Sequence, residues 1–305
     1  MIKKYLPMAV VAILLAIAIF TLDLAALVGH MGSINVWVWT LLVAMQVTTQ
    51  LLINWQWHVI AKAIEKPVPY QNMIYINSQG AVVDAITPGV KIGGEITRGV
   101  MLTKVGGYTP TQAGALVAIQ KLFSIGALGV VLLLVANHMA TWVALLVFAP
   151  VVLAPGNVKG YLLKKKAPSH RLLHKVWAGS VTLLGYLQLI KANKKAFALL
   201  CGLSLLIWAL YPVKAYILVW QFYTGIHFTY VAGITFGAYM VAMLPIFPGG
   251  AGGYEGTMTA LLVATGLDIN YALAIAMLFR FITFWLVMLM GAVYVWVYKL
   301  KKGSG

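Results

Sequence analysis

The sequence predicts an all-α polytopic membrane protein with about six full spans and two re-entrant broken-helix hairpins in an inverted repeat. Three observations lead to this fold class. The chain of 305 residues is 62% hydrophobic and only 9% charged, whereas a soluble domain carries about 25% charged residues. The charges fall in short clusters between apolar segments of spanning length. Two apolar regions, 70–105 and 229–265, are interrupted by proline and glycine and carry matching motifs.

The charge balance is basic, with 22 Lys and Arg against 6 Asp and Glu. Nucleic-acid-binding proteins also carry such an excess, but they place it on a soluble face. Here the basic residues lie between apolar segments, so no nucleic-acid partner is expected. A single cysteine, Cys201, excludes an internal disulfide. No residue pattern calls for a cofactor or a metal ion.

Six segments are long and apolar enough to cross a bilayer as helices of about 20 residues. The first follows Lys3 and Lys4 and has too long an apolar part for a signal peptide, so a retained helix is expected. The predicted spans are 5–28, 36–60, 111–136, 141–158, 196–221 and 271–298.

Residues 169–191 have a different pattern, with leucines at helical spacing among basic and histidine residues. Two interpretations stay open for this segment. It forms either an amphipathic helix at the membrane interface or a short buried helix between spans. Residues 159–195 as a whole are expected to be a basic connector on the cytoplasmic side.

The positions of lysine and arginine set the topology, because cytoplasmic loops are enriched in both. Both termini are then cytoplasmic in the cell (plasma or inner) membrane. Region 70–105 enters and leaves from the cytoplasmic side, and region 229–265 does so from the outside. A packed pair of full crossings in each region gives the same topology, and that alternative stays open.

The two broken regions contain "TPGVKIGGEITRGVMLTKVG" at 87–106 and "FPGGAGGYEGTMTALLVATG" at 247–266. Seven of these twenty positions are identical at an offset of 160 residues, without a gap. The same offset superposes the flanking spans, so one transmembrane domain, 1–305, contains repeat units 36–136 and 196–296. The identical pairs are Pro88/Pro248, Gly89/Gly249, Gly93/Gly253, Glu95/Glu255, Thr97/Thr257, Leu102/Leu262 and Gly106/Gly266.

Each Pro-Gly step is expected to end one half-helix, and the next half-helix begins near Gly93 or Gly253. The N-terminus of that second half-helix suits an anion such as a lipid phosphate. Inverted repeats with broken helices are typical of secondary transporters, whose substrate site lies where the breaks meet near the midplane. The hairpins could instead be structural, with glycines that only allow close packing.

Charged side chains inside apolar segments identify the candidate site. Glu95 and Glu255 lie in the first turn after each break, where they either cap the half-helix or bind a proton or a cation. Arg98 is three residues after Glu95, a spacing that favours a salt bridge. Lys121 and Arg280 are expected to have interior partners.

Three further charged residues complete this set. Lys214 is expected to extend its amine to the membrane interface. Lys91 flanks Glu95, and Asp84 precedes the first break. Asp84 either faces the same cavity or lies near the surface, and this choice stays open.

The motifs "TPGVKIGGEITR", "IQKLFSIG", "FPGGAGGYEG" and "LFRFITFWLVMLMG" resemble the transmembrane flippase domain of lysylphosphatidylglycerol synthetases. The likeness covers about residues 5–300. Family members often have an acidic-Arg pair where this chain has Gln120-Lys121, which puts the substrate and the coupling mode in doubt. Carried over by position, the matching residues are Pro88, Gly93, Gly94, Glu95, Arg98, Pro248, Gly249, Gly250, Gly253, Glu255 and Arg280.

The resemblance implies translocation of a phospholipid, or another lipid with a charged head group, between leaflets. It does not imply the synthetase activity, so the chain is not expected to be an enzyme. An ion-coupled transporter of a small solute and a membrane enzyme acting on lipid phosphates are the alternatives. The expected partners are membrane lipids, and assembly into homo-oligomers stays open. The candidate substrate-binding residues are Pro88, Gly89, Gly93, Gly94, Glu95, Arg98, Lys121, Pro248, Gly249, Gly250, Gly253, Glu255 and Arg280, with Asp84 and Lys91 as additional candidates.

Overall fold

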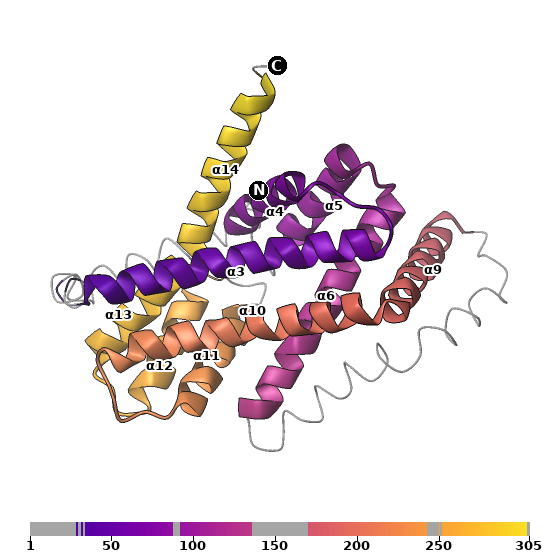
Figure 1. Cartoon of the computed structure of the whole chain (residues 1–305). Helices are drawn as coiled ribbons and strands as arrows, with labels where there is room; N and C mark the ends of the chain where they lie inside the picture. The colour runs from indigo at the N-terminus through magenta and orange to yellow at the C-terminus, as the bar shows by residue number, and fades with distance from the viewer. Residues whose placement is uncertain are drawn as a thin grey trace. The chain divides into compact units, whose positions relative to one another are not determined.

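A computed structural model describes residues 29, 32, 34–87, 92–135, 170–242, 250 and 252–303 of the chain. These residues form helices and short connections, with no strand among them (Figure 1). The predicted all-α fold is therefore confirmed. The predicted spans 5–28 and 141–158 lie outside the described residues.

Four helical segments in the described part are long and apolar enough to cross a membrane. They coincide with four of the predicted spans. They are α3 (Val36–Ala63), α6 (Pro110–Val135), α10 (Lys194–Trp220) and the continuous run Ile269–Lys301. The last run consists of α13 (Ile269–Arg280), a π-helical turn η1 (Phe281–Trp285) and α14 (Leu286–Gly303).

Local chemistry sets the ends of these spans. The side chain of Asn35 accepts a hydrogen bond from the Trp37 amide at the start of α3, and Asp268 does the same for Asn270 at the start of α13. Such caps satisfy amides that have no partner within the helix. After α3 the chain turns through Glu65, whose φ of 60° is unfavourable for helix.

Two separate helices are described in each Pro-Gly region, which agrees with the predicted interruption. The first consists of α4 (Tyr70–Ile86) and α5 (Ile92–Gly106), and the second of α11 (Phe228–Ala242) and α12 (Gly253–Val263). With 17, 15, 15 and 11 residues, these four helices are shorter than the about 20 residues that a helix needs to cross a bilayer. That each pair of helices forms a re-entrant hairpin, and the side from which it enters the membrane, stay predictions.

Helix α9 (Arg171–Ala192) occupies the segment for which two interpretations stood open. It packs against α6, and its residues Leu187 and Ile190 are buried in the same apolar core. Val176, near its beginning, is 61% exposed. The second half of α9 therefore buries one face in this core, while Leu189 on the same half is 41% exposed and the first half presents apolar surface outward.

The chain divides into two compact units. The first contains α3 up to Gln50, α4 from Ser78, α10 from Leu210, and helices α11 to α14. The second contains the remainder of α3, α4 and α10, most of α5, and all of α6 and α9. Each unit thus contains the second helix of one Pro-Gly region and the span that follows it, together with parts of α3 and α10.

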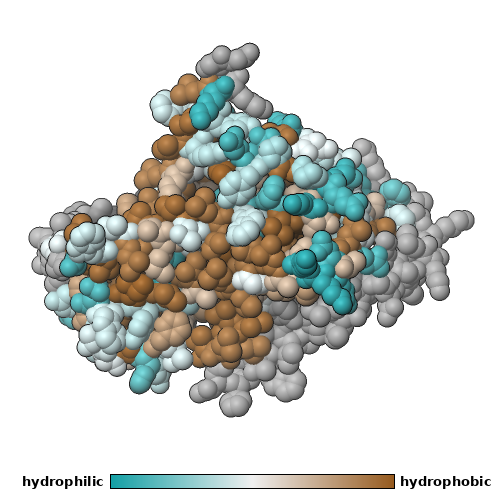
Figure 2. Space-filling model, in the orientation of Figure 1, coloured by the Kyte–Doolittle hydropathy of each residue, from teal (hydrophilic) through white to brown (hydrophobic). Residues whose placement is uncertain are grey.

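Each unit has its own buried apolar core. On the outside, Trp37 and Leu134 are 76% and 78% exposed, as expected for side chains in contact with lipid. Figure 2 shows apolar side chains over much of α3 and α10 on the visible face, with hydrophilic residues around α5 and at the far end of α14. This distribution is typical of spans whose ends reach the polar interface.

Tyr108 stabilises the turn between α5 and α6. Its hydroxyl donates a hydrogen bond to the Lys66 carbonyl at 2.5 Å. Burial raises the pKa of Tyr108, so the hydroxyl stays protonated and remains a donor. This contact fixes the end of α5 that lies opposite the break.

Candidate functional site

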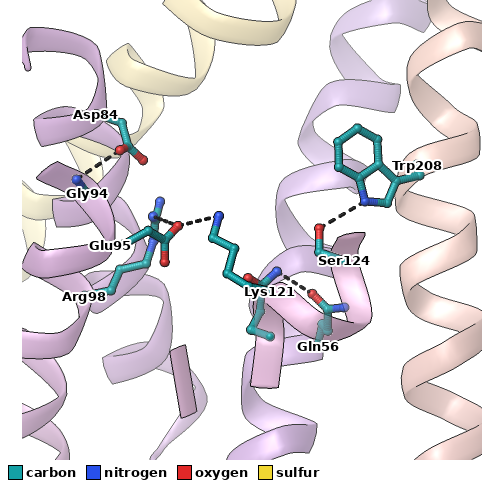
Figure 3. A network of polar contacts seen from close by, with 9 residues as sticks. Gln56, Asp84, Gly94, Glu95, Arg98, Lys121, Ser124 and Trp208 are labelled. Carbon is teal, nitrogen blue, oxygen red and sulfur yellow. Dashed lines mark hydrogen bonds and ion pairs between the residues drawn. The ribbon is translucent and has the colours of Figure 1, made fainter. Parts of the chain in front are cut away.

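Glu95 and Glu255 both lie in the first turn of the helix that follows a break, as the sequence predicts. Each makes contacts within its own compact unit. In the second unit, Glu95 Oε1 accepts from two cations, Lys121 Nζ at 2.7 Å and Arg98 Nη1 at 2.9 Å (Figure 3). The predicted salt bridge between Arg98 and Glu95 is therefore confirmed, and Lys121 has the interior partner expected of it.

The side chains around Glu95 differ in their access to the surroundings. Those of Arg98 and Glu95 are 13% and 18% exposed, while that of Lys121 is 39% exposed. Glu95 Oε2 is buried and has no hydrogen-bond partner among the described residues. Lys121 is thus the accessible cation of this cluster.

In the first unit, Arg280 Nε lies 3.5 Å from Glu255 Oε1. Arg280 is only 5% exposed, and its guanidinium carbon lies 4.0 Å from the centre of the Phe284 ring and 5.3 Å from that of Tyr254. Cation–π contacts of this kind strengthen when they are desolvated. Arg280 therefore has the interior partner predicted for it, in a more enclosed setting than Lys121.

Both helix N-termini already hold a carboxylate of the chain. At the start of α5, Asp84 Oδ1 accepts from the Gly94 amide at 3.0 Å. At the start of α12, Glu255 Oε2 accepts from the Gly252 amide at 2.8 Å. Asp84 is 7% exposed. It therefore does not lie at the surface, and its buried carboxylate caps the start of α5.

Gly94 offers a direct test of this cap, because a side-chain carbon there would overlap the Asp84 carboxylate. We expect Gly94→Ala to lower the free energy of unfolding by about 1–3 kcal/mol, the cost of leaving a buried polar group without its hydrogen bond. Gly99→Ala is the matched control on the same helix, since nothing lies within 4 Å of its new carbon. It should be neutral or stabilising by up to about 1 kcal/mol. Thermal unfolding of the purified protein in detergent compares the two, and equal effects would contradict the role given to Asp84.

The basic partners do not follow the offset of 160 residues. At that offset Gln120, not Lys121, corresponds to Arg280. Gln120 instead donates to Gln56 Oε1 at 3.1 Å, and Gln56 donates to Ser204 at 2.6 Å. A carboxylate–cation pair therefore occurs after both breaks. The cation of the first pair is at position 121, one residue after the position that corresponds to Arg280. Lys121 also has a carboxylate partner, Glu95, despite the missing acid at position 120.

The prediction for Lys214 is wrong. Its side chain does not extend to the interface but is fully buried. Nζ donates to Gln46 Oε1 at 2.5 Å and to Thr49 Oγ1 at 3.2 Å, and it lies 4.6 Å from the centre of the Tyr211 ring. The ammonium points inward because polar acceptors on α3 lie beside α10 at this level.

The remaining predicted residues differ in how closely they approach the charged groups. Gly250, with φ of 76°, lies against Arg280, and a side-chain carbon there would come within 3.1 Å of Nη2. Gly253 is buried at the first position of α12. Gly93 lies against the side chain of Thr87, which a side-chain carbon would approach to 2.5 Å. Pro88, Gly89, Lys91, Pro248 and Gly249 lie outside the described residues.

Three residues near the charged groups were not predicted from the sequence. Tyr254 is fully buried and stacks on Phe279, with ring centres 6.0 Å apart. Gln46 and Thr49 are fully buried as well. Their signal in the sequence is a set of polar residues within an otherwise apolar span, which at membrane depth indicates an interior position.

Comparisons with known proteins agree with this architecture. The chain is 22% identical to a UPF0104 membrane protein of Pyrococcus horikoshii over 326 aligned positions, which cover 96% of each chain. It is 21% identical to a UPF0104 membrane protein of Methanothermobacter thermautotrophicus over 267 positions, or 79% of each chain. Residues 6–291 match the family described as "Lysylphosphatidylglycerol synthase TM region". This match covers nearly the whole sequence, and the chain belongs to that family of membrane proteins.

Proposed function

We propose that this protein is a lipid transporter, a flippase that moves a phospholipid or another lipid with a charged head group between the two leaflets. It would act as a transporter and not as an enzyme. One observation carries the proposal: a carboxylate–cation pair lies at the first turn after each of two helix breaks. Ionisable side chains at membrane depth are costly and by default mark a substrate or ion pathway.

The cations are the groups suited to the phosphate of a lipid. An ammonium or guanidinium forms charge-assisted hydrogen bonds with phosphate oxygens. Lys121 is the accessible member of its cluster, with 39% of its side chain exposed. A phosphate could therefore reach Lys121 first and compete with Glu95 for it.

The carboxylates are suited to hold the cations while no substrate is bound. Without Glu255, the guanidinium of Arg280, a residue that is only 5% exposed, would lose the carboxylate that lies 3.5 Å from it. Glu255 or Glu95 could also carry a proton during transport. Because the two helix N-termini hold Glu255 and Asp84, the cations are favoured over the backbone amides as phosphate ligands.

The outer surface is compatible with a lipid whose acyl chains remain in the bilayer. Large apolar side chains are exposed on several spans, including Trp37 on α3 and Leu134 on α6. In the cell we expect both termini on the cytoplasmic side of the cell membrane, in line with the positive-inside rule.

Reconstitution tests the proposal. Vesicles containing the purified protein should expose inner-leaflet phospholipid that carries a fluorescent label to a membrane-impermeant quencher faster than matched vesicles with an unrelated membrane protein. Uptake of radiolabelled inorganic phosphate into the same vesicles tests transport of a small solute. Phosphate uptake without lipid exchange would contradict the proposal, and so would exchange no faster than in the control vesicles.

A further inference from the structure

Lys214 is a buried cation that the proposed site does not use. Its ammonium contacts two neutral acceptors, Gln46 Oε1 and Thr49 Oγ1, and the face of the Tyr211 ring. Within the described part of the chain, no carboxylate lies within salt-bridge distance of it. This differs from Lys121 and Arg280, each of which contacts a glutamate.

A second observation at the same place concerns Gln46. The residue is fully buried, and its Nε2 has no hydrogen-bond partner among the described residues. Native proteins satisfy most buried donors, so each exception requires an explanation. Here an ammonium without a counter-ion and an amide without an acceptor belong to side chains in direct contact. One group with anionic oxygens would supply a counter-charge to the ammonium and an acceptor to the amide.

Lys214 is also linked to the candidate site within the same compact unit. The Tyr211 ring lies 5.5 Å from that of Tyr239, centre to centre, and Tyr239 lies 4.8 Å from Tyr254. Tyr254 in turn lies beneath the guanidinium of Arg280. A continuous row of tyrosines therefore connects Lys214 with Arg280.

We propose that Lys214 and Gln46 form a subsite for a phosphate group, whose oxygens accept from the ammonium and from the free amide hydrogens. The phosphate would supply the charge and the acceptors that this part of the unit lacks. Because Lys214 is fully buried, the proposal requires α3 and α10 to part locally for a ligand to enter. Pro212, inside α10 and two residues before Lys214, removes one backbone hydrogen bond of the helix and permits such bending.

The phosphate could belong to a lipid or to a soluble compound. A lipid origin rests on the proposed function, whereas binding itself can be measured without transport. The probes are dioctanoyl phosphatidate and inorganic phosphate, with dioctanoylglycerol as the probe that lacks phosphate. Isothermal titration calorimetry on the purified full-length protein in detergent gives the affinity for each.

Two variants remove the subsite by different routes. Lys214→Met removes the cation, and Gln46→Glu keeps the shape but supplies Lys214 with a carboxylate of the chain itself. Both should weaken binding of the phosphate probe by about tenfold or more, since hydrogen bonds to charged groups are lost or already satisfied. Gln46→Glu should unfold at the wild-type temperature or above, because an unpaired buried charge gains a counter-charge. Lys214→Met removes that charge but leaves Gln46 Oε1 without its donor, so thermal unfolding of this variant is the control that its fold is retained. Lys104→Met, which removes an exposed cation at the end of α5, is the control and should bind as the wild type does.

The outcomes separate the alternatives. Binding of phosphatidate alone assigns the phosphate to a lipid, and binding of inorganic phosphate as well assigns the subsite to phosphate from either source. The proposal is overturned if neither phosphate probe binds more tightly than dioctanoylglycerol, or if Lys214→Met or Gln46→Glu binds them like the wild type. The leaflet-exchange assay with wild-type protein decides the proposed transport separately, so that failure of one idea leaves the other standing.

Discussion

Replacing Arg280 with methionine is expected to destabilise the protein more than the same replacement of Lys121, which contacts Glu95. Arg280 is 5% exposed, and its guanidinium contacts Glu255, Phe284 and Tyr254. Its removal leaves the Glu255 carboxylate, 19% exposed, without its cation. Breaking a buried pair from one side costs about 3–5 kcal/mol, and the partial exposure of Glu255 places the expected loss at about 3 kcal/mol.

The pair around Glu95 provides the matched comparison. Lys121→Met removes a cation from the corresponding carboxylate, but Arg98 still holds Glu95 at 2.9 Å. Lys121 is also 39% exposed, so its loss should cost less than about 1 kcal/mol. Unfolding in detergent, followed by intrinsic tryptophan fluorescence, should therefore rank the two variants clearly.

A double variant tests the cause of the Arg280 effect. Glu255→Gln combined with Arg280→Met removes both charges, so part of the lost stability should return. If the double variant is less stable than Arg280→Met by the full cost of a second independent mutation, the ion pair is not the source of the loss. The stacking of Arg280 on Phe284 would then account for it.

The sequence was sufficient to predict the four spans that the structure describes and the separate helices of each Pro-Gly region. The helices α3, α6 and α10 agree closely with predicted segments because a bilayer requires long uninterrupted apolar runs. Pro88 and Pro248 predicted the two breaks, because proline and the residue before it disfavour helix. Such signals are local, and they do not depend on which helices become neighbours.

The site was predictable only in part, because side-chain partners depend on packing between distant segments. Arg98 could be assigned to Glu95 from a spacing of three residues. Gln46 could not be assigned to Lys214 from the sequence, because 168 positions separate the two residues. Lys214 was misplaced because a long amine usually extends towards water, and only the structure revealed buried acceptors on α3.

Glu255→Gln is expected to reduce leaflet exchange by about tenfold or more while the protein remains folded. Charge-assisted interactions contribute about 1.5–3 kcal/mol each, and this variant removes the charge that holds Arg280. The glutamine side-chain oxygen can still accept from the Gly252 amide, which lies 2.8 Å from Glu255 Oε2. The start of α12 therefore keeps its cap, and the substitution acts on charge more than on local structure.

The control makes the same chemical change at Glu65, which lies exposed in the turn after α3. Glu65→Gln should exchange lipid at the wild-type rate, measured in vesicles with equal amounts of folded protein. Exchange by Glu255→Gln at the wild-type rate would remove Glu255 from the mechanism. An equal loss in both variants would point to the total charge of the protein and away from a specific site. A loss of exchange in Glu255→Gln alone would mean that exchange requires the carboxylate beside Arg280. The two variants change the net charge equally and differ only in the position of the substituted residue.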